Sequence, residues 1–126
     1  MKARTLPAVR AVLIGGFDDN TKKLIEQSAR RFGAKTVVAG NDDLDTKIKT
    51  LISGNTAKGG EVCSDRFMIM NPGDFASAFI DELKAKGVSV PLKAVVTLHS
   101  QEWTLKILLD ELKQEHMTLT RGQDGK

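Results

Sequence analysis

Apolar residues in this chain form two kinds of pattern: short continuous runs, and stripes with spacings of three and four. The runs are VRAVLIGG at 9–16, KTVVA at 35–39, RFMIM at 66–70 and KAVVTL at 93–98. Short apolar runs bounded by turn residues predict buried strands, and the stripe after each run predicts an amphipathic helix. We therefore predict an α/β fold: a single domain with a four-stranded, mainly parallel sheet covered by helices, in which β-α-β-α occurs twice.

Capping residues predict where the helices begin and end. Side chains of Asp, Asn and Ser accept hydrogen bonds from the free N–H groups of a first turn, and glycine commonly follows a last turn. The expected starts are Asp18 or Asp19, Asn41 or Asp42, Asn71 followed by Pro72, and Ser100. The expected ends are Gly33, Gly54, Gly87 and, for the last helix, about His116.

The domain is expected to span residues 1–126, with loose tails at 1–8 and 117–126. Residues 53–65 are rich in small and polar side chains, which predicts an exposed loop that contains Cys63. The two halves also resemble each other, since VLI at 12–14 aligns with FMI at 67–69. Either a duplication with pseudo-two-fold symmetry or chance similarity of short apolar strands accounts for this match.

Composition excludes several classes of protein. Charged residues are 28% of the chain and the net charge is +3, with Lys and Arg scattered, so nucleic-acid binding is not expected. No apolar run approaches the length of a membrane span. The only cysteine is Cys63, which rules out an internal disulfide and suits a reducing compartment. We therefore expect a bacterial-style cytoplasmic protein.

Ligands of open α/β sheets bind beyond the carboxyl ends of the strands, which parallel strands bring to one end of the sheet. That rule predicts a strand-end site, and its candidate ligand-binding residues are Gly16, Asn71, Thr97, His99, Ser100 and Trp103. No catalytic residues, no metal ligands and no cofactor are predicted. The segment GGFDDN lacks the GxGxxG spacing of a dinucleotide site, and His99 has no second His or Cys near it in the sequence.

These patterns favour a non-catalytic module that binds a protein or a small ligand through the strand-end site. The alternative is a small enzyme acting on a small metabolite, with His99 as acid or base beside Asp18 or Asp19 and Asn71. A four-stranded sheet leaves two edge strands, so a homodimer or another protein partner is also expected.

Residues 66–116 carry a more specific pattern: the strand KAVVT at 93–97, a polar turn, Trp103, and the helix end ELKQEH at 111–116. This pattern resembles a small bacterial family known as Domain of Unknown Function 3783. The first half of the chain matches that family only in the order of its elements. The family's turn usually reads Thr-Pro-Thr-Asn, whereas Leu98, His99 and Ser100 follow Thr97 here, so a role of that Pro or Asn does not transfer. The resemblance implies the fold and no activity.

Overall fold

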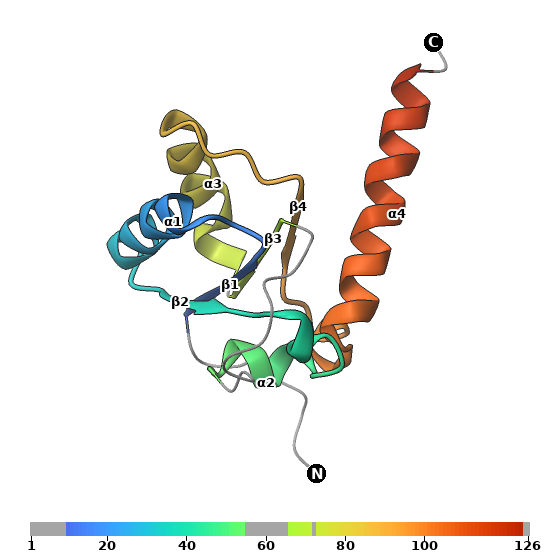
Figure 1. Ribbon diagram of the computed structural model, residues 1–126, viewed down its shortest axis with the longest axis horizontal. Helices are drawn as coiled ribbons and strands as arrows, with labels where there is room; N and C mark the ends of the chain where they lie inside the picture. The colour runs from blue at the N-terminus through green and yellow to red at the C-terminus, as the bar shows by residue number, and fades with distance from the viewer. Residues whose placement is uncertain (1–9, 55–65, 72, 125–126) are drawn as a thin grey trace.

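A computed structural model describes residues 10–54, 66–71 and 73–124 of the chain (Figure 1). The strands are β1 (Ala11–Gly15), β2 (Lys35–Val38), β3 (Phe67–Asn71) and β4 (Leu92–Val95). The α-helices are α1 (Asp19–Arg31), α2 (Ile48–Ile52), α3 (Ala76–Ala85) and α4 (Leu105–Asp124). Short 3-10 turns form η1 (Asn41–Asp43), η2 (Gly73–Phe75) and η3 (Ser100–Glu102). The predicted α/β fold, with β-α-β-α occurring twice, is confirmed.

The four strands form one sheet in the order β2-β1-β3-β4. Strand β1 is parallel to β2 and β3 is parallel to β4, but β1 and β3 are antiparallel, with Ala11 opposite Asn71 and Gly15 opposite Phe67. The sheet is therefore mainly parallel, as predicted. However, β1 and β2 finish at one end of the sheet while β3 and β4 finish at the other. The expectation that all four strands finish at one end is wrong.

The direction of β3 could not be read from the sequence because the chain between Ile52 and Phe67 is long enough to reach either end of the sheet. A β-α-β connection has a preferred hand, but this connection joins one such unit to the next and has no such restriction. The central antiparallel pair is the arrangement that two-fold-related units would give. Whether the two halves arose by duplication stays a prediction.

Both faces of the sheet are covered: α1 and α3 lie on one side, and α2 and α4 lie on the other (Figure 1). Alternate residues of a strand point to opposite faces, so each central strand contributes to two cores. Val12, Ile14, Met68 and Met70 pack under α1 and α3, and Ala11, Leu13, Phe67 and Ile69 pack under α2 and α4. This two-sided burial explains why β1 and β3 read as continuous apolar runs.

Three phenylalanine rings join α1 to α3. The ring of Phe32 lies 5.9 Å from that of Phe75 and 5.8 Å from that of Phe79, measured between centroids. The guanidinium of Arg10 stacks 4.9 Å above the Phe75 ring and also bonds to Asp74, with 3.2 Å between Nη1 and Oδ2. Aromatic and cation–π contacts of this kind fix the two helices against each other and against the start of β1.

Helix starts agree with the sequence in one place and differ in others. The Asp18 carboxylate accepts a hydrogen bond from the Thr21 N–H at 3.0 Å, so the predicted cap of α1 is confirmed. Asn71 is not the N-cap of α3, because it is the last residue of β3 and the chain enters η2 before α3 begins. The expected second helix, from Asn41 or Asp42 to Gly54, is divided into η1 and the short α2.

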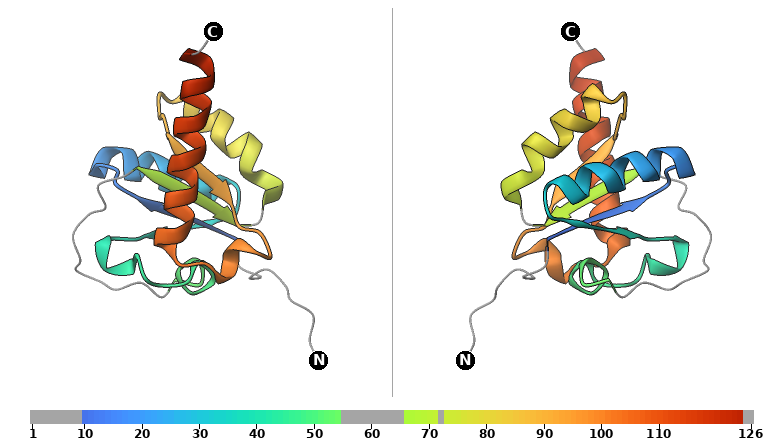
Figure 2. Two further views of the ribbon diagram at one scale, coloured as in Figure 1. Left: turned by 90° about the vertical axis from the view of Figure 1, so that its right-hand side faces the viewer. Right: turned by 90° about the vertical axis from the view of Figure 1, so that its left-hand side faces the viewer.

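The last helix also differs from its prediction. Ser100 lies in η3, and the hydroxyl of Thr104 instead accepts the Ile107 N–H at the start of α4, at 3.3 Å. The helix continues to Asp124, beyond the expected end at His116, and projects past the rest of the domain (Figure 2). Residues 117–124 contain no proline and one glycine, so nothing in them ends a helix outright. The predicted tail thus includes helical backbone.

Several predictions fall on residues outside the described ranges: the tail at 1–8, most of the 53–65 loop with Cys63, and the role of Pro72. Ser53 and Gly54, where the loop was expected to begin, are exposed. Among the helices that the structure describes, none combines the length and the apolar character that crossing a membrane would need.

Candidate functional site: the turn after β4

The turn that follows β4, residues 97–103, is called the β4-end turn. The backbone N–H of Val96 still bonds to the Met70 carbonyl at 2.9 Å, so the chain leaves the sheet at Thr97. There the Ser100 hydroxyl accepts the Thr97 N–H at 3.0 Å, and the Thr97 hydroxyl accepts the Ser100 N–H at 2.9 Å. The Thr97 hydroxyl also donates to Ser100 Oγ at 3.0 Å. Both side chains therefore hold the turn in shape.

The exposed tip of the turn consists of Leu98 and His99. Leu98 is 47% exposed. The imidazole of His99 meets the indole of Trp103 edge to face, with 5.5 Å between ring centroids and 88° between planes. Trp103 is half-buried and packs against the core under α2 and α4. The turn thus presents an aliphatic and an aromatic side chain from a backbone that is anchored in the core.

A second segment, residues 44–49, supports the turn from the α2 side. The N–H of Ile48 donates to the Trp103 carbonyl at 2.8 Å, and Lys47 forms an antiparallel bridge with Thr104. Lys49 Nζ lies 2.9 Å from one oxygen of Glu102, and Lys47 Nζ lies 3.4 Å from the other. The hydrogen bond from Lys49 lowers the pKa of the Glu102 carboxyl below its ordinary value of 4.5, and the Lys47 hydrogen bond acts in the same direction.

The sequence did not identify Glu102 or its two lysines. They are separated by 53 and 55 residues and come from different elements, so no local spacing signals the contact. Gln101 is also buried, at 3% exposure, and its amide donates to the Leu98 carbonyl at 3.3 Å. The signal that could have indicated a structural role is the density of polar side chains in a turn that is flanked by apolar runs.

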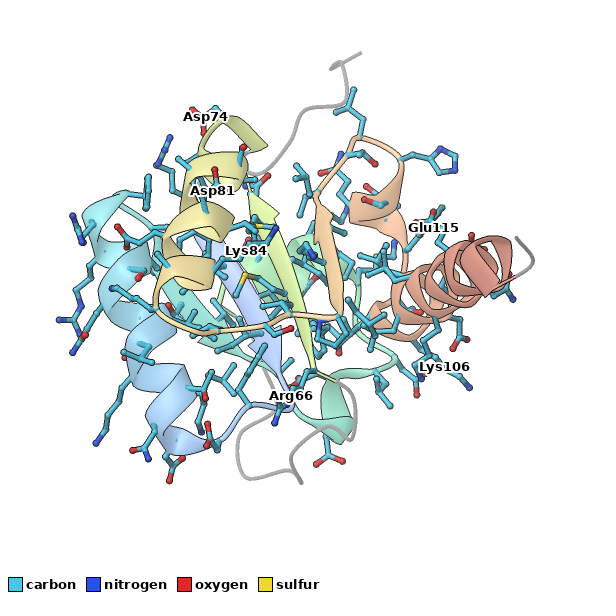
Figure 3. All side chains as sticks on the ribbon, turned by 90° about the horizontal axis from the view of Figure 1, so that it is seen from above. Arg66, Asp74, Asp81, Lys84, Lys106 and Glu115 are labelled. Atoms are coloured by element: carbon cyan, nitrogen blue, oxygen red, sulfur yellow. The ribbon has the colours of Figure 1, made fainter. Side chains whose placement is uncertain are left out.

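Five of the six predicted site residues lie at the end of the sheet where β3 and β4 finish: Asn71, Thr97, His99, Ser100 and Trp103. Gly16 lies at the opposite end, because it follows β1. Figure 3 shows the two ends of the sheet, since Arg66 precedes β3 and Asp74 follows it, and the two residues lie at opposite ends. Of the five residues, Asn71 is fully buried and His99 is exposed.

The same geometry separates the acid–base groups of the alternative enzyme hypothesis. Asp18 and Asp19 begin α1 beyond Gly16, at the other end of the sheet from His99. General acid–base catalysis requires groups within hydrogen-bond reach of one substrate. Neither Asp18 nor Asp19 can therefore act on the same substrate as His99, and the residue set of the alternative hypothesis is wrong. Among the described residues, no group of three or more His, Cys, Asp or Glu side chains could hold a metal ion.

Comparison with known proteins gives a match to one family model. Neither the curated proteins nor the solved structures gave a match to this chain. Residues 66–119 match the family described as a domain of unknown function (DUF3783), a segment that runs from the start of β3 into α4 and includes the whole β4-end turn. The resemblance that the sequence indicated for this half of the chain is thereby confirmed.

Proposed function

We propose that this protein is a non-catalytic binding module that recognises a partner protein through Leu98 and His99 at the tip of the β4-end turn. The observation that carries the proposal is that Leu98 is 47% exposed on a turn whose hydroxyl groups already bond to each other. An apolar side chain held outward in this way gains stabilisation when a partner removes it from water.

The rigidity of the turn favours binding. Association costs free energy whenever loops and side chains lose freedom, so a surface that is ordered in advance loses less. The Thr97–Ser100 hydrogen bonds and the two lysines on Glu102 order this surface before a partner arrives. Aromatic residues are enriched among the side chains that dominate binding energy, and the His99–Trp103 pair supplies one beside Leu98.

Ile107 provides a matched control for the experiment. Its exposed fraction of 48% is close to the 47% of Leu98, but Ile107 lies on α4 and has no part in the turn. The test places a photo-crosslinking amino acid at position 98 of the full chain, in extract of the source cells. The expected result is a discrete adduct that purified wild-type protein and Ile107→Glu suppress by competition, while Leu98→Glu does not. An adduct with twice the mass of the chain would identify the partner as a second copy.

If Leu98→Glu competes as well as the wild type, the proposed surface is wrong. Because Leu98 lies on the surface, Leu98→Glu is expected to fold. Its urea unfolding curve, followed by the emission of the single tryptophan Trp103, checks this independently of binding.

A further inference from the structure

A hollow of about 300 Å³ lies between α3 and β4, in a region that the β4-end turn does not include. Its apolar wall comes from Ile80, Leu83, Val88 and Val90, and two lysines, Lys84 and Lys93, also line it. Ligand sites in proteins commonly combine an apolar wall with a few charged groups, in cavities of roughly 300–1,000 Å³. The volume therefore suits a small molecule.

The sequence builds this hollow from three local patterns. Ile80, Leu83 and Lys84 are three and four residues apart, so they share one stripe of α3. Val88 and Val90 alternate along the connector after α3 and are 7% and 8% exposed, so both face inward. Lys93 pairs with Met68, which packs under α1 and α3, and so it projects from β4 on the side of the sheet that α3 covers.

The two ammonium groups give the hollow its charge. Lys93 Nζ donates to the Val90 carbonyl at 3.2 Å, which holds it against the wall and leaves two of its three N–H donors for another group. Among the described residues the ammonium group of Lys84 has no hydrogen-bond or ion-pair partner, and Figure 3 shows Lys84 on the side of α3 toward the strands. None of the described carboxylates lines the hollow.

The carboxyl end of α3 opposes an anion there, because its dipole is equivalent to roughly half a negative charge. The carbonyls of Glu82, Leu83 and Lys84 already accept hydrogen bonds from the N–H groups that follow the helix. Two full positive charges outweigh this partial negative charge. The net field in the hollow therefore favours a negatively charged group near Lys84 and Lys93.

The structure assigns this hollow as a binding site for a small organic anion with an apolar body, such as a medium-chain carboxylate. The carboxylate would lie between Lys84 and Lys93, and the hydrocarbon would lie against Leu83, Val88 and Val90. Charge-assisted hydrogen bonds orient the ligand, and burial of its hydrocarbon supplies further affinity.

Octanoate is a suitable probe, with octanol as its uncharged counterpart. In a titration of the full chain followed by amide chemical shifts, octanoate is expected to give saturable shifts at residues 83–93. Octanol is expected to bind at least about tenfold more weakly, since a hydrogen bond to a charged group is stronger than one between neutral groups. The double variant Lys84→Gln with Lys93→Gln should bind octanoate with an affinity at least about tenfold lower than that of the wild type. The exposed Lys106→Gln on α4 is the control and should leave the affinity unchanged.

The assignment would be overturned by equal binding of octanol and octanoate in the hollow, or by the absence of saturable shifts at residues 83–93. Unchanged octanoate affinity in the double variant would do the same. Since Lys84 is exposed and has no described partner, Lys84→Gln alone tests the charge even if the double variant fails to fold.

Discussion

Alanine at Gly15 would be forced into the core between β1 and β3. Gly15 pairs with Phe67 across the antiparallel ladder, and the Phe67 side chain is fully buried. A Cβ at Gly15 would lie 2.7 Å from Cζ of that ring and 3.2 Å from the carbonyl oxygen of Ala39, while the contact with Phe67 Cε2 is closer still. The backbone of Gly15 needs no positive φ, so the cost of Gly15→Ala comes from overpacking alone.

Overpacking of a dense core typically costs about 1–3 kcal/mol, and we expect a value of about 2–3 kcal/mol here because the ring has no exposed side toward which to move. Gly73→Ala is the matched control. Its Cβ would meet Val95 Cγ1 at 2.6 Å, but Val95 is 37% exposed and can rotate away. The expected loss for Gly73→Ala is below about 1 kcal/mol.

Urea unfolding followed by Trp103 emission gives the free energy of unfolding for each variant. Phe67→Leu shortens the obstructing side chain. The loss of unfolding free energy in the double variant Gly15→Ala with Phe67→Leu should therefore be smaller than the summed losses of the two single variants, by at least about 1 kcal/mol. Additive effects within about 0.5 kcal/mol would refute the reasoning, because Gly15 and Phe67 would then not be in contact.

Three further changes test local contacts, each by urea unfolding. Ser100→Ala removes the acceptor of the Thr97 N–H from a buried position and should cost about 1–3 kcal/mol. Ser53→Ala removes an exposed hydroxyl that donates to the Lys49 carbonyl, and it should cost less than about 1 kcal/mol. Asp18→Ala removes the cap of α1 and should cost about 1 kcal/mol. Asp19→Ala should cost less, because the Asp19 carboxylate is exposed and makes only a surface ion pair with Lys22. Glu102 has a lowered pKa in the fold, so its stabilisation is present above pH 4.5 and is lost as pH falls through the folded value; Glu102→Gln should flatten this part of the pH profile.

Each of these expectations can fail separately. Equal losses of unfolding free energy in the two serine variants would show that the Thr97–Ser100 hydrogen bonds do not stabilise the β4-end turn. A larger loss of unfolding free energy for Asp19→Ala than for Asp18→Ala would show that Asp19, not Asp18, caps α1. If Glu102→Gln leaves the difference in stability between about pH 5 and about pH 3 unchanged, the two lysines do not stabilise that carboxylate in solution.

The sequence predicted the elements well because their signals are local. The run at 9–16 is continuous and apolar since both faces of β1 are covered, and Asp18 caps α1 from the adjacent position. The match of residues 66–119 to a known family agrees with the strong local pattern around Trp103. Periodicity and capping depend on neighbours within a few residues, which is the information that a single sequence contains.

The candidate site could be predicted only in part, because it depends on how distant segments meet. The direction of β3 relative to β1 decides whether Gly16 joins His99, and no local pattern determines it. The pairing of Glu102 with Lys47 and Lys49 joins separate elements in the same way. Asparagine is a preferred residue at helix N-caps, but Asn71 pairs with Ala11 as the last residue of β3, and this strand pairing outweighs the capping preference.

The most direct test of this fold and its sites is the set of nuclear Overhauser effects between the backbones of β1 and β3. The antiparallel register predicts cross-strand contacts that join Val12 to Met70 and Ile14 to Met68. These contacts would place Gly16 and His99 at opposite ends of the sheet, so Gly16 could take no part in a site at the β4-end turn. Contacts that instead join Val12 to Met68 and Ile14 to Met70 would show parallel strands, contradict the antiparallel pairing, and bring Gly16 and His99 to the same end of the sheet.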